Sequence, residues 1–284
     1  MRDFQGRVAV VTGAASGIGR ALGVRFAEAG MNVVLADVQR DALEATAAQL
    51  REHGGEVRAV VTDVTQADDL LALAEATEDA FGAAHVVCHN AGVFAAGLSW
   101  EAPLTDYAWV LDVNVWGVIH GIRAFTPRLL SHGEPAHQVI TASMAGVTTS
   151  PFVAPYTLSK HAAVALAETL YLELRAKQSA IGVSVLCPEV VATRIGDSER
   201  NRPEHQKRDG PTHAERDLVE DALRASTVGG LAPEAIAART FEAIEEDRFY
   251  VFPPDGDPWR LACERRLDDI RHVRNPNYEP PVSS

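Results

Sequence analysis

The sequence predicts a doubly wound α/β protein, in which helices cover both faces of a parallel sheet to give three α/β/α layers. Two features of the 284-residue chain support this fold class. Short apolar segments alternate with longer amphipathic segments along most of the chain, as in βαβ units. Most of the short segments are almost continuously apolar, which is typical of parallel strands that are buried on both faces.

The short apolar segments give about seven predicted strands. They are residues 7–12, 32–37, 57–63, 85–90, 137–142, 183–188 and 249–252. Between them, apolar residues recur at helical spacing, as Leu43, Ala47 and Leu50 do. The predicted helices run from a first glycine-rich turn to about Gly30, and then over residues 42–52, 66–81, 105–131, 156–177 and 233–247.

The chain is expected to form one domain with an extension. Residues 1–252 hold all the predicted strands as one dinucleotide-binding catalytic domain, and residues 253–284 form a C-terminal extension. Residues 190–230 are rich in charge, proline and glycine, which predicts a long loop acting as a substrate lid. In the extension, residues 259–273 are amphipathic, and residues 275–284 are expected not to pack on the domain.

Bulk properties exclude several classes of function. The formal net charge of −13 disfavours nucleic acid and anionic lipid as partners. No apolar run reaches the roughly 20 residues that span a bilayer, and the first residues lack the pattern of a signal peptide. Cys88, Cys187 and Cys263 lie far apart, so we expect buried, reduced thiols in a cytoplasmic protein and no metal site.

A glycine-rich turn joins the first predicted strand to the first predicted helix. Its sequence is Thr-Gly-Ala-Ala-Ser-Gly-Ile-Gly over residues 12–19. Glycine lets the backbone approach a pyrophosphate closely, and the helix N-terminus offers free N–H groups and the positive end of its dipole. We expect this turn to bind a dinucleotide through Gly13, Ser16, Gly17, Ile18 and Gly19; a tight turn without a ligand is the alternative.

Acidic and small residues at the ends of later strands are further cofactor candidates. Asp37 ends the second strand, where a carboxylate accepts hydrogen bonds from the adenosine ribose and repels a 2′-phosphate. NAD is therefore the predicted cofactor and NADP is less favoured. The nearby basic side chain of Arg40 leaves NADP as an alternative. The remaining candidates beside the adenosine are Asp63, Val64, Asn90, Ala91 and Gly92, and ordinary turns explain them equally well when each is taken alone.

Tyr156 and Lys160 stand four residues apart near the start of a predicted helix, so their side chains share one face. A free tyrosine has a pKa of about 10, which is too high for a base at neutral pH. A nearby ammonium favours the phenolate, and so does the positive charge of an oxidised nicotinamide. The pair predicts acid/base chemistry, although surface Tyr/Lys pairs at this spacing are common.

Five motifs together resemble those of the short-chain dehydrogenase/reductase family over about residues 4–252. They are the turn at residues 12–19, Asn90-Ala-Gly92, Asn114, Ser143 and Tyr156-x-x-x-Lys160. The resemblance implies a Rossmann-type domain and hydride transfer between NAD and a secondary alcohol or ketone, without a metal. It also implies a homo-oligomer, a tetramer or a dimer, that associates through the helices near residues 105–131 and 156–177.

The resemblance gives each matching residue an expected role. Tyr156 exchanges a proton with the substrate oxygen, and Lys160 lowers the pKa of Tyr156 and binds the nicotinamide ribose. Ser143 orients the substrate oxygen. Asn114 holds a water in a proton relay, and Thr193 binds the carboxamide.

Two positions depart from the family pattern. The family usually has glycine after the proline that follows the sixth strand, whereas this chain has Pro188-Glu189. Pro188 is still expected to contact the cofactor, and the Glu189 carboxylate is interpreted as pointing to solvent rather than contacting substrate. His89 replaces the more usual asparagine before Asn90 and is expected only to fill space.

The substrate pocket is expected between the ends of the fourth to sixth strands and the lid. Its mostly apolar candidates favour a hydrophobic or aromatic alcohol or ketone, although core packing explains each residue at least as well. They are Phe94, Met144, Ala145, Val147, Phe152, Val153, Glu189 and Val190. The basic lid residues Arg194, Arg200, Arg202, His205, Lys207 and Arg208 are interpreted as a solvated charged loop.

Three other functions fit parts of the pattern: an NADP-dependent carbonyl reductase, a non-catalytic dinucleotide-binding scaffold or sensor, and a dehydratase or epimerase. Asp37 argues against the first, and the retention of both Tyr156 and Lys160 argues against the second. The glycine spacing and the single predicted domain argue against the third.

Overall fold

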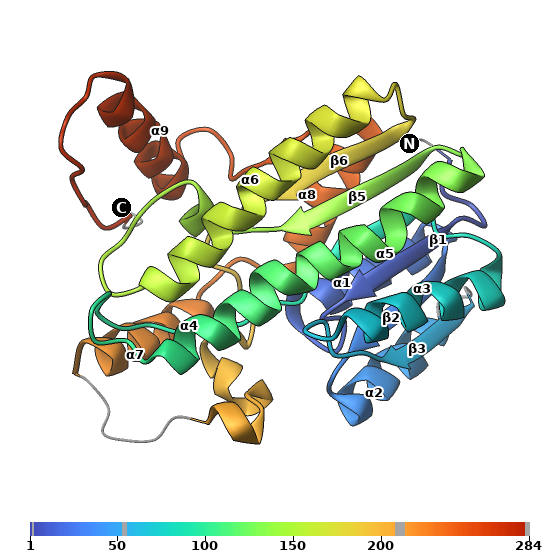
Figure 1. Cartoon of the computed structure of the whole chain (residues 1–284), viewed down its shortest axis with the longest axis horizontal. Coiled ribbons are helices and arrows are strands. Elements are labelled where there is room, and N and C mark those ends of the chain that lie inside the picture. Colours follow the sequence, from blue (N-terminus) through green and yellow to red (C-terminus); the bar gives the residue numbers. More distant parts are fainter. Residues whose placement is uncertain (2, 53–55, 208–213, 282–284) are drawn as a thin grey trace.

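The structure is a computed structural model that describes residues 1, 3–52, 56–207 and 214–281. Within this part of the chain, a seven-stranded parallel sheet forms the middle of the molecule in the order β3-β2-β1-β4-β5-β6-β7 (Figure 1). The strands are β1 Val8–Thr12, β2 Asn32–Asp37, β3 Val57–Val61, β4 Val86–His89, β5 Ala136–Thr141, β6 Ile181–Leu186 and β7 Tyr250–Val251. The predicted fold class is confirmed. Strand order reverses between β1 and β4, and ligands of open α/β sheets bind at such a point.

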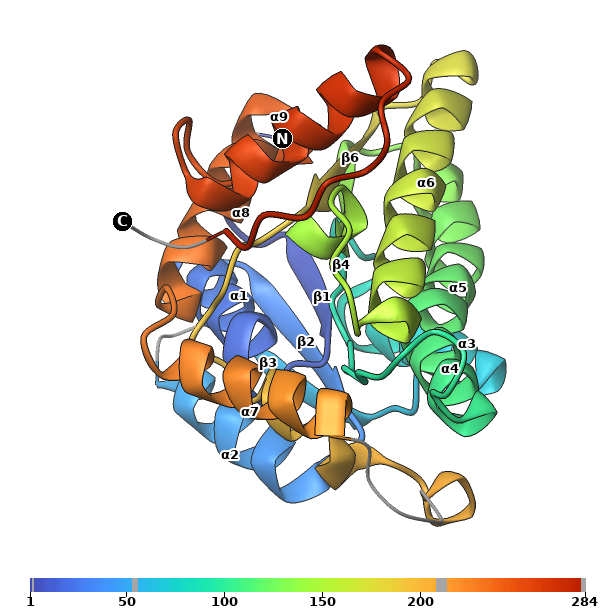
Figure 2. The ribbon, with the colours of Figure 1, turned by 90° about the vertical axis from the view of Figure 1, so that its left-hand side faces the viewer.

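Helices cover both faces of the sheet (Figure 2). One face carries α3 Ala67–Phe81, α5 Gly117–His132 and α6 Ala154–Ala176, and the other carries α1 Gly17–Glu28, α2 Arg40–Arg51 and α8 Pro233–Glu246. A buried apolar cluster fills each interface: Leu73 and Phe125 belong to the first, and Phe26, Leu43 and Phe241 to the second. The predicted layers are present because the apolar stripe of each helix meets a sheet that is apolar on both sides.

The helix predicted over residues 105–131 is interrupted. It consists of α4 Leu104–Leu111, a π-helical turn η1 Asp112–Trp116, and α5. Asn114 lies in η1, where its side chain accepts from the Val93 N–H (2.8 Å) and donates to the Val93 carbonyl (2.9 Å). Such turns are rare and occur frequently at functional sites.

The lid is more ordered than the predicted loop. It contains the 3-10 turns η3 Ile195–Asn201 and η4 Glu204–Gln206 and the 15-residue helix α7 Ala214–Val228, while residues 208–213 lie outside the described residues. The prediction of a long loop was wrong for α7. Its apolar residues Val219 and Leu223 pack against the cluster of Phe94 and Val153, so the helix folds on its tertiary contacts and not on a clear sequence period.

The C-terminal extension begins with α9 Pro258–Arg271, which agrees with the predicted amphipathic segment. Residues 275–280 are all exposed, as expected for a segment that does not pack on the domain, although the segment still contacts α9. Residues 276–279 line a cavity beside α9, and Glu279 pairs with Arg265 at 3.7 Å. An ion pair and three prolines, which restrict the backbone, explain how a segment without regular structure takes a defined course. Residues 282–284 lie outside the described residues.

Other expectations concern cysteines, metals and membranes. Cys88, Cys187 and Cys263 are all free and buried, as predicted. Among the described residues, no cluster of three or more His, Cys, Asp or Glu side chains is arranged to hold a metal ion. Within the same residues, no helix has the length and apolarity to cross a membrane.

Candidate active site

The glycine-rich turn connects the end of β1 to the start of α1, and its backbone path requires glycine. A Cβ on Gly13 would lie 2.7 Å from the Cα of Ala91, and a Cβ on Gly19 would lie 2.2 Å from the Gly13 carbonyl oxygen. Gly17 has φ +55°, and a Cβ there would meet Thr193 at 3.0 Å. The turn therefore lies directly beside the loops that follow β4 and β6.

The start of α1 fits a phosphate group. Ser16 is the N-cap with an extended backbone (φ −160°), and its side chain makes no capping hydrogen bond in the described structure. The first-turn N–H groups of a helix have no intrahelical acceptor, so they are suited to an anion such as a pyrophosphate. Gly13, Ser16, Gly17 and Ile18 all line the same cavity.

Asp37 ends β2 and faces the turn. One carboxylate oxygen accepts from the Ala15 N–H (3.0 Å), and the other accepts from the Gln39 N–H (2.9 Å). The carboxylate thus holds the turn in place, which is a structural role, and it also lines the cavity. Arg200 of the lid lines the cavity too, and the Asp37 charge acts on that guanidinium.

The other adenosine candidates also lie at the carboxyl ends of the strands. Asp63 Oδ1 accepts from the N–H and the hydroxyl of Thr65, at 3.0 and 2.8 Å, so Asp63 stabilises a turn. The Asn90 amide donates to the Thr12 carbonyl at 3.0 Å and ties β4 to the glycine-rich turn. Asp63, Val64, Asn90, Ala91 and Gly92 all line the cavity, and their predicted contacts with a cofactor stay predictions.

Tyr156 and Lys160 lie in the first two turns of α6, on one face as expected. The Lys160 Nζ lies 5.6 Å from the centre of the Tyr156 ring and donates to the Thr141 carbonyl at 2.9 Å. Burial raises the pKa of Tyr156 to about 12, although a hydrogen bond with Ser143 acts in the opposite direction. Burial also lowers the pKa of Lys160 to about 8. The pKa of Tyr156 therefore lies above its ordinary value, and the lowering expected from Lys160 stays a prediction.

Ser143 and Asn114 support this pair from neighbouring elements. Ser143 follows β5, and its oxygen accepts from the Ala145 N–H at 3.1 Å while remaining within hydrogen-bonding reach of Tyr156. Asn114 is buried, and its amide also donates to the Ser159 hydroxyl at 2.9 Å, which holds the loop after β4 against α6. The predicted water relay through Asn114 stays a prediction.

One cavity of about 1100 Å³ brings almost all the predicted site residues together at the carboxyl ends of the strands. Asp37 and the glycine-rich turn line one part of it, and Ser143, Tyr156 and Lys160 line another. The lining also includes Thr193 and Pro188 and the predicted substrate residues Phe94, Met144, Ala145, Phe152, Val153, Glu189 and Val190. Gly19, Asn114 and Val147 are not among the lining residues.

Sequence reasoning missed part of the cavity wall. Val219 and Leu223 come from α7, within the lid that was expected to line the pocket, but neither residue was named as a candidate. Trp259 and Tyr278 come from the C-terminal extension, which was not expected to line it. The apolar pair of α7 is separated by charged residues, so a helical period was not recognised. For Trp259 and Tyr278, the presence of aromatic residues in the extension is the only signal in the sequence. Their place in the cavity wall depends on the path of the chain after β7, which the sequence pattern does not give.

Two interpretations of single residues were wrong. Glu189 does not point to solvent: its side chain is only 7% exposed and forms an ion pair with Arg239 of α8 at 3.0 Å. Both carboxylate oxygens accept from that guanidinium, which compensates for burial of the charge. His89 does more than fill space, because its ring nitrogen lies 3.1 Å from the Gln138 side-chain oxygen. Gly121 makes room for the ring, since a Cβ there would lie 2.3 Å from it.

The lid was also wrongly interpreted as wholly solvated. Arg202 and Asp106 of α4 form an ion pair at 2.9 Å, and both side chains are 0% exposed. The Arg202 guanidinium lies 4.0 Å from the centre of the Trp109 ring and also pairs with Glu199 at 2.9 Å. The contacts of Arg202 with Asp106 and Trp109 hold the lid against α4. Arg208 lies outside the described residues.

The fold and the site define a class of protein: a Rossmann-type dinucleotide-binding protein with a buried tyrosine and lysine in the same cavity as its phosphate-binding turn. The chain also matches the family described as short chain dehydrogenase over residues 7–204. The chain belongs to the short-chain dehydrogenase/reductase family.

Individual relatives agree with this assignment. A 1-deoxy-11-beta-hydroxypentalenate dehydrogenase of Streptomyces exfoliatus is 40% identical over 98% of this chain and 93% of its own length. A C alpha-dehydrogenase of a Sphingobium species is 32% identical over 89% of this chain and 82% of its own. A short chain dehydrogenase/reductase from Burkholderia phymatum, crystallised with NAD, is 43% identical with a TM-score of 0.96 over 100% of both chains. The chain is therefore an oxidoreductase of the alcohol dehydrogenase type that uses a nicotinamide dinucleotide.

Proposed function

We propose that this protein is an NAD-dependent dehydrogenase of hydrophobic secondary alcohols, and of the corresponding ketones in reverse, with Tyr156 as the acid/base. The observation that carries the proposal is the cavity, which is lined by Asp37 and the glycine-rich turn in one part and by Tyr156, Lys160 and Ser143 in another. When bound, the dinucleotide supplies the acceptor or donor of the hydride.

The proton is handled by residues of this chain. Tyr156 accepts the proton of the alcohol during oxidation and returns it during reduction. Ser143 hydrogen-bonds the same substrate oxygen and orients it. Because burial raises the pKa of Tyr156 to about 12, oxidation at neutral pH requires positive charge near the phenol. Lys160, whose Nζ lies 5.6 Å from the ring centre, supplies the protein's share of that charge.

NAD is proposed as the preferred cofactor because the Asp37 carboxylate occupies the end of β2. A carboxylate in that position binds ribose hydroxyls and repels a 2′-phosphate. Arg200, which lines the cavity and feels the charge of Asp37, is the observation in favour of NADP as the alternative. The NAD-bound relative supports the first choice. Thr193, beside Gly17, is proposed to hold the carboxamide.

The substrate is proposed to be apolar because the wall around Tyr156 is apolar. The Phe94 ring lies 5.0 Å from the Tyr156 ring, and Phe94 and Val153 are buried together against Val219 and Leu223 of α7. Polar groups near the reacting oxygen are provided by Ser143 and Tyr156. An apolar pocket with a few placed polar groups is typical of small-molecule sites.

The decisive experiment is a screen at 340 nm with NAD and NADP against aliphatic, alicyclic and aromatic secondary alcohols. We expect NADH formation with hydrophobic members of the panel and a higher kcat/KM with NAD than with NADP. Tyr156→Phe should keep NAD binding by calorimetry and lose turnover by at least about a hundredfold. Near-normal turnover by this variant would disprove the assigned role of Tyr156.

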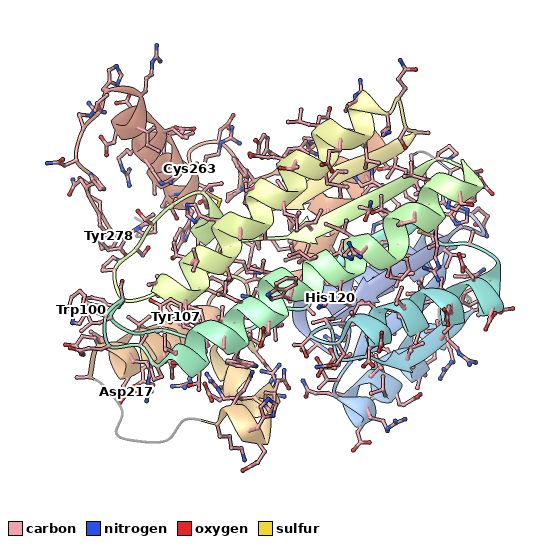
Figure 3. The ribbon with its side chains drawn as sticks, viewed as in Figure 1. Trp100, Tyr107, His120, Asp217, Cys263 and Tyr278 are labelled. Carbon is pink, nitrogen blue, oxygen red and sulfur yellow. The ribbon has the colours of Figure 1, made fainter. Side chains whose placement is uncertain are left out.

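We further propose that the protein is a homo-oligomer, a tetramer or a dimer, in the cytoplasm. Large apolar side chains of η1, α5 and α6 are exposed, namely Trp116, Leu130, Leu158 and Leu172. Trp116 stacks on His120 with 5.7 Å between ring centres, and Figure 3 shows His120 on α5. Light scattering should give a mass of two or four chains, and a monomer would contradict the proposal. Three free, buried thiols agree with a reducing compartment.

A further inference from the structure

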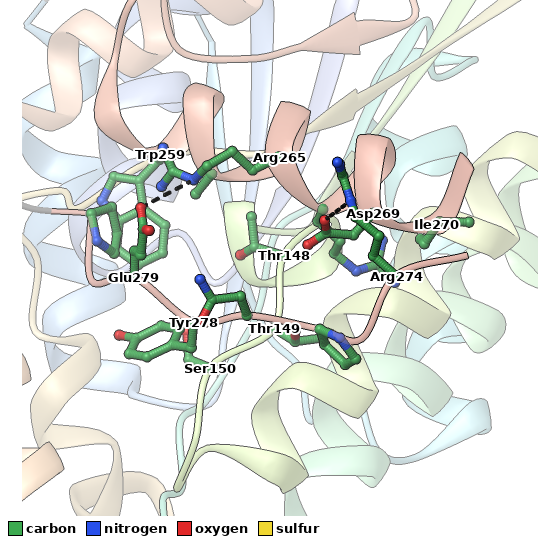
Figure 4. Close-up of a pocket in the computed structure, with 15 residues that line it drawn as sticks. Thr148, Thr149, Ser150, Trp259, Arg265, Asp269, Ile270, Arg274, Tyr278 and Glu279 are labelled. Carbon is green, nitrogen blue, oxygen red and sulfur yellow. Dashed lines mark hydrogen bonds and ion pairs between the residues drawn. The ribbon is translucent and has the colours of Figure 1, made fainter. Parts of the chain in front are cut away.

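The C-terminal segment, residues 274–281, follows α9 and returns along it toward the sheet. Figure 2 shows it running back along α9, and Figure 3 shows Tyr278 on this segment. Two sets of surface ion pairs connect it to α9. Arg265 pairs with Glu279 at 3.7 Å, and Arg274 pairs with Asp269 at 2.9 Å (Figure 4). Arg274 also pairs with Asp268. The segment thus contacts α9 of its own chain through its charged side chains.

The C-terminal segment separates two cavities. The first is the active-site cavity, which is lined by Tyr278, Pro280 and Pro281 as well as by Tyr156. The second has a volume of about 240 Å³ and lies between α9, the segment and residues 148–150 (Figure 4). Ser150, Trp259, Tyr278 and Pro281 line both. These four residues therefore form the partition between the two spaces.

We propose that this partition is a specificity determinant, in which Tyr278 limits the length of the alcohol that reaches Tyr156. The inference deepens the proposed function and rests on it, because it concerns the substrate of the same site. It assigns the far wall of the substrate cavity to the extension after β7. The ligand class is an apolar secondary alcohol whose end distant from the hydroxyl lies against aromatic and proline side chains.

The chemistry of the partition supports a limit on size. Tyr278, Trp259 and Pro281 present aromatic or ring surfaces, and proline loses little conformational freedom when it is fixed in a wall. Tyr278 is 44% exposed, so its ring borders open space and does not fill a core. Removing it would join the second cavity to the first and add up to about 240 Å³. A cavity of about 150 Å³ suffices for benzene, so the added volume is enough for another ring.

The alternative is that the segment only stabilises the domain. A stabilising role changes kcat/KM for all alcohols by the same factor, whereas a wall changes the ratio between long and short alcohols. The ratio is therefore the informative readout. Leu267 offers a matched control: it lies on α9, is 55% exposed, and is not a lining residue of either cavity.

The test compares Tyr278→Ala, Tyr278→Trp and the control Leu267→Ala in the full-length protein. The assay measures kcat/KM with NAD for secondary alcohols of one, two and three rings. We expect Tyr278→Ala to raise the ratio of the longest to the shortest alcohol by about tenfold or more, and Tyr278→Trp to lower it. Leu267→Ala should keep the ratio of the unchanged protein.

Two results would overturn the inference, and they differ in what else they reject. If the unchanged protein oxidises these alcohols and both Tyr278 variants keep its ratio, the partition does not select substrate, while the proposed function stands. If the unchanged protein oxidises none of them with either cofactor, both the proposed function and the inference fail.

Discussion

Replacing Arg202 with alanine is expected to lower the free energy of unfolding by about 4–6 kcal/mol. Arg202 and Asp106 are both 0% exposed, and their atoms lie 2.9 Å apart. Removing one partner of such a pair costs about 3–5 kcal/mol, because the remaining buried charge loses the attraction that compensated for its burial. The guanidinium also lies 4.0 Å from the centre of the Trp109 ring, and loss of this contact adds about 1 kcal/mol.

The expected shift in melting temperature follows from the size of the chain. At roughly 2.1 cal/mol/K per residue, unfolding of this 284-residue protein has an entropy near 0.6 kcal/mol/K. The predicted loss therefore corresponds to a decrease in Tm of about 7–10 °C. Scanning calorimetry on the full chain, with and without NAD, measures this decrease directly.

Two further variants make the Arg202 experiment decisive. Arg248→Ala removes a pair of similar length, 3.0 Å to Glu246, whose side chains are 40% and 63% exposed, so its effect should stay within about 1 kcal/mol. The double variant Asp106→Leu, Arg202→Met removes both charges and should recover much of the stability. If Arg202→Ala melts within about 2 °C of Arg248→Ala, the buried pair does not stabilise the lid as reasoned.

Three other changes test separate parts of the structure. Asp37→Ser should raise kcat/KM for NADP relative to NAD by about tenfold or more, because it removes the charge that repels a 2′-phosphate; an unchanged ratio argues against a ribose contact. Glu189→Gln should cost about 2 kcal/mol in urea unfolding, because the amide cannot replace both charged contacts with Arg239; no loss would mean that the pair is not stabilising. Burial lowers the pKa of His89 to about 4 and of His137 to about 3, whereas the ordinary value is 6.5. At a pH below 6.5 and above these lowered pKa values, the unfolded chain therefore binds protons on the two histidines that the folded protein does not bind. Stability should therefore fall by about 2 kcal/mol per histidine from pH 7 to pH 5, and His137→Gln should remove about half of that decrease; an unaltered decrease would contradict the assignment.

Much of the fold could be predicted because local pattern and tertiary structure agree in the βαβ units. Val10 and Val34 belong to continuous apolar runs, and the structure buries both in parallel strands. Elements that depend on distant contacts were predicted less well. The helix α7 carries charged residues between Val219 and Leu223, and only packing against Phe94 and Val153 shows which face is apolar. A period-based reading has no access to that packing.

The same distinction between local signals and distant contacts applies to the residues of the candidate site. Gly13, Tyr156 and Lys160 were found because their spacing within the chain carries the signal. The orientation of Glu189 was not found, because its partner Arg239 is 50 residues further along the chain. Without other information, a charged side chain is predicted to be exposed to solvent. Burial of the charge is favourable only when a specific partner compensates for it.

The positions in the sequence of the residues that line the active-site cavity have consequences for how such proteins diversify. The family match ends at residue 204, whereas Val219, Leu223, Trp259 and Tyr278 of the cavity wall all come later in the chain. The residues proposed for catalysis and this part of the proposed substrate wall thus occupy separate stretches of the chain. If the proposed roles hold, exchanging the stretch after residue 204 redirects the reaction to a new alcohol, while the residues proposed for hydride and proton transfer are inherited unchanged.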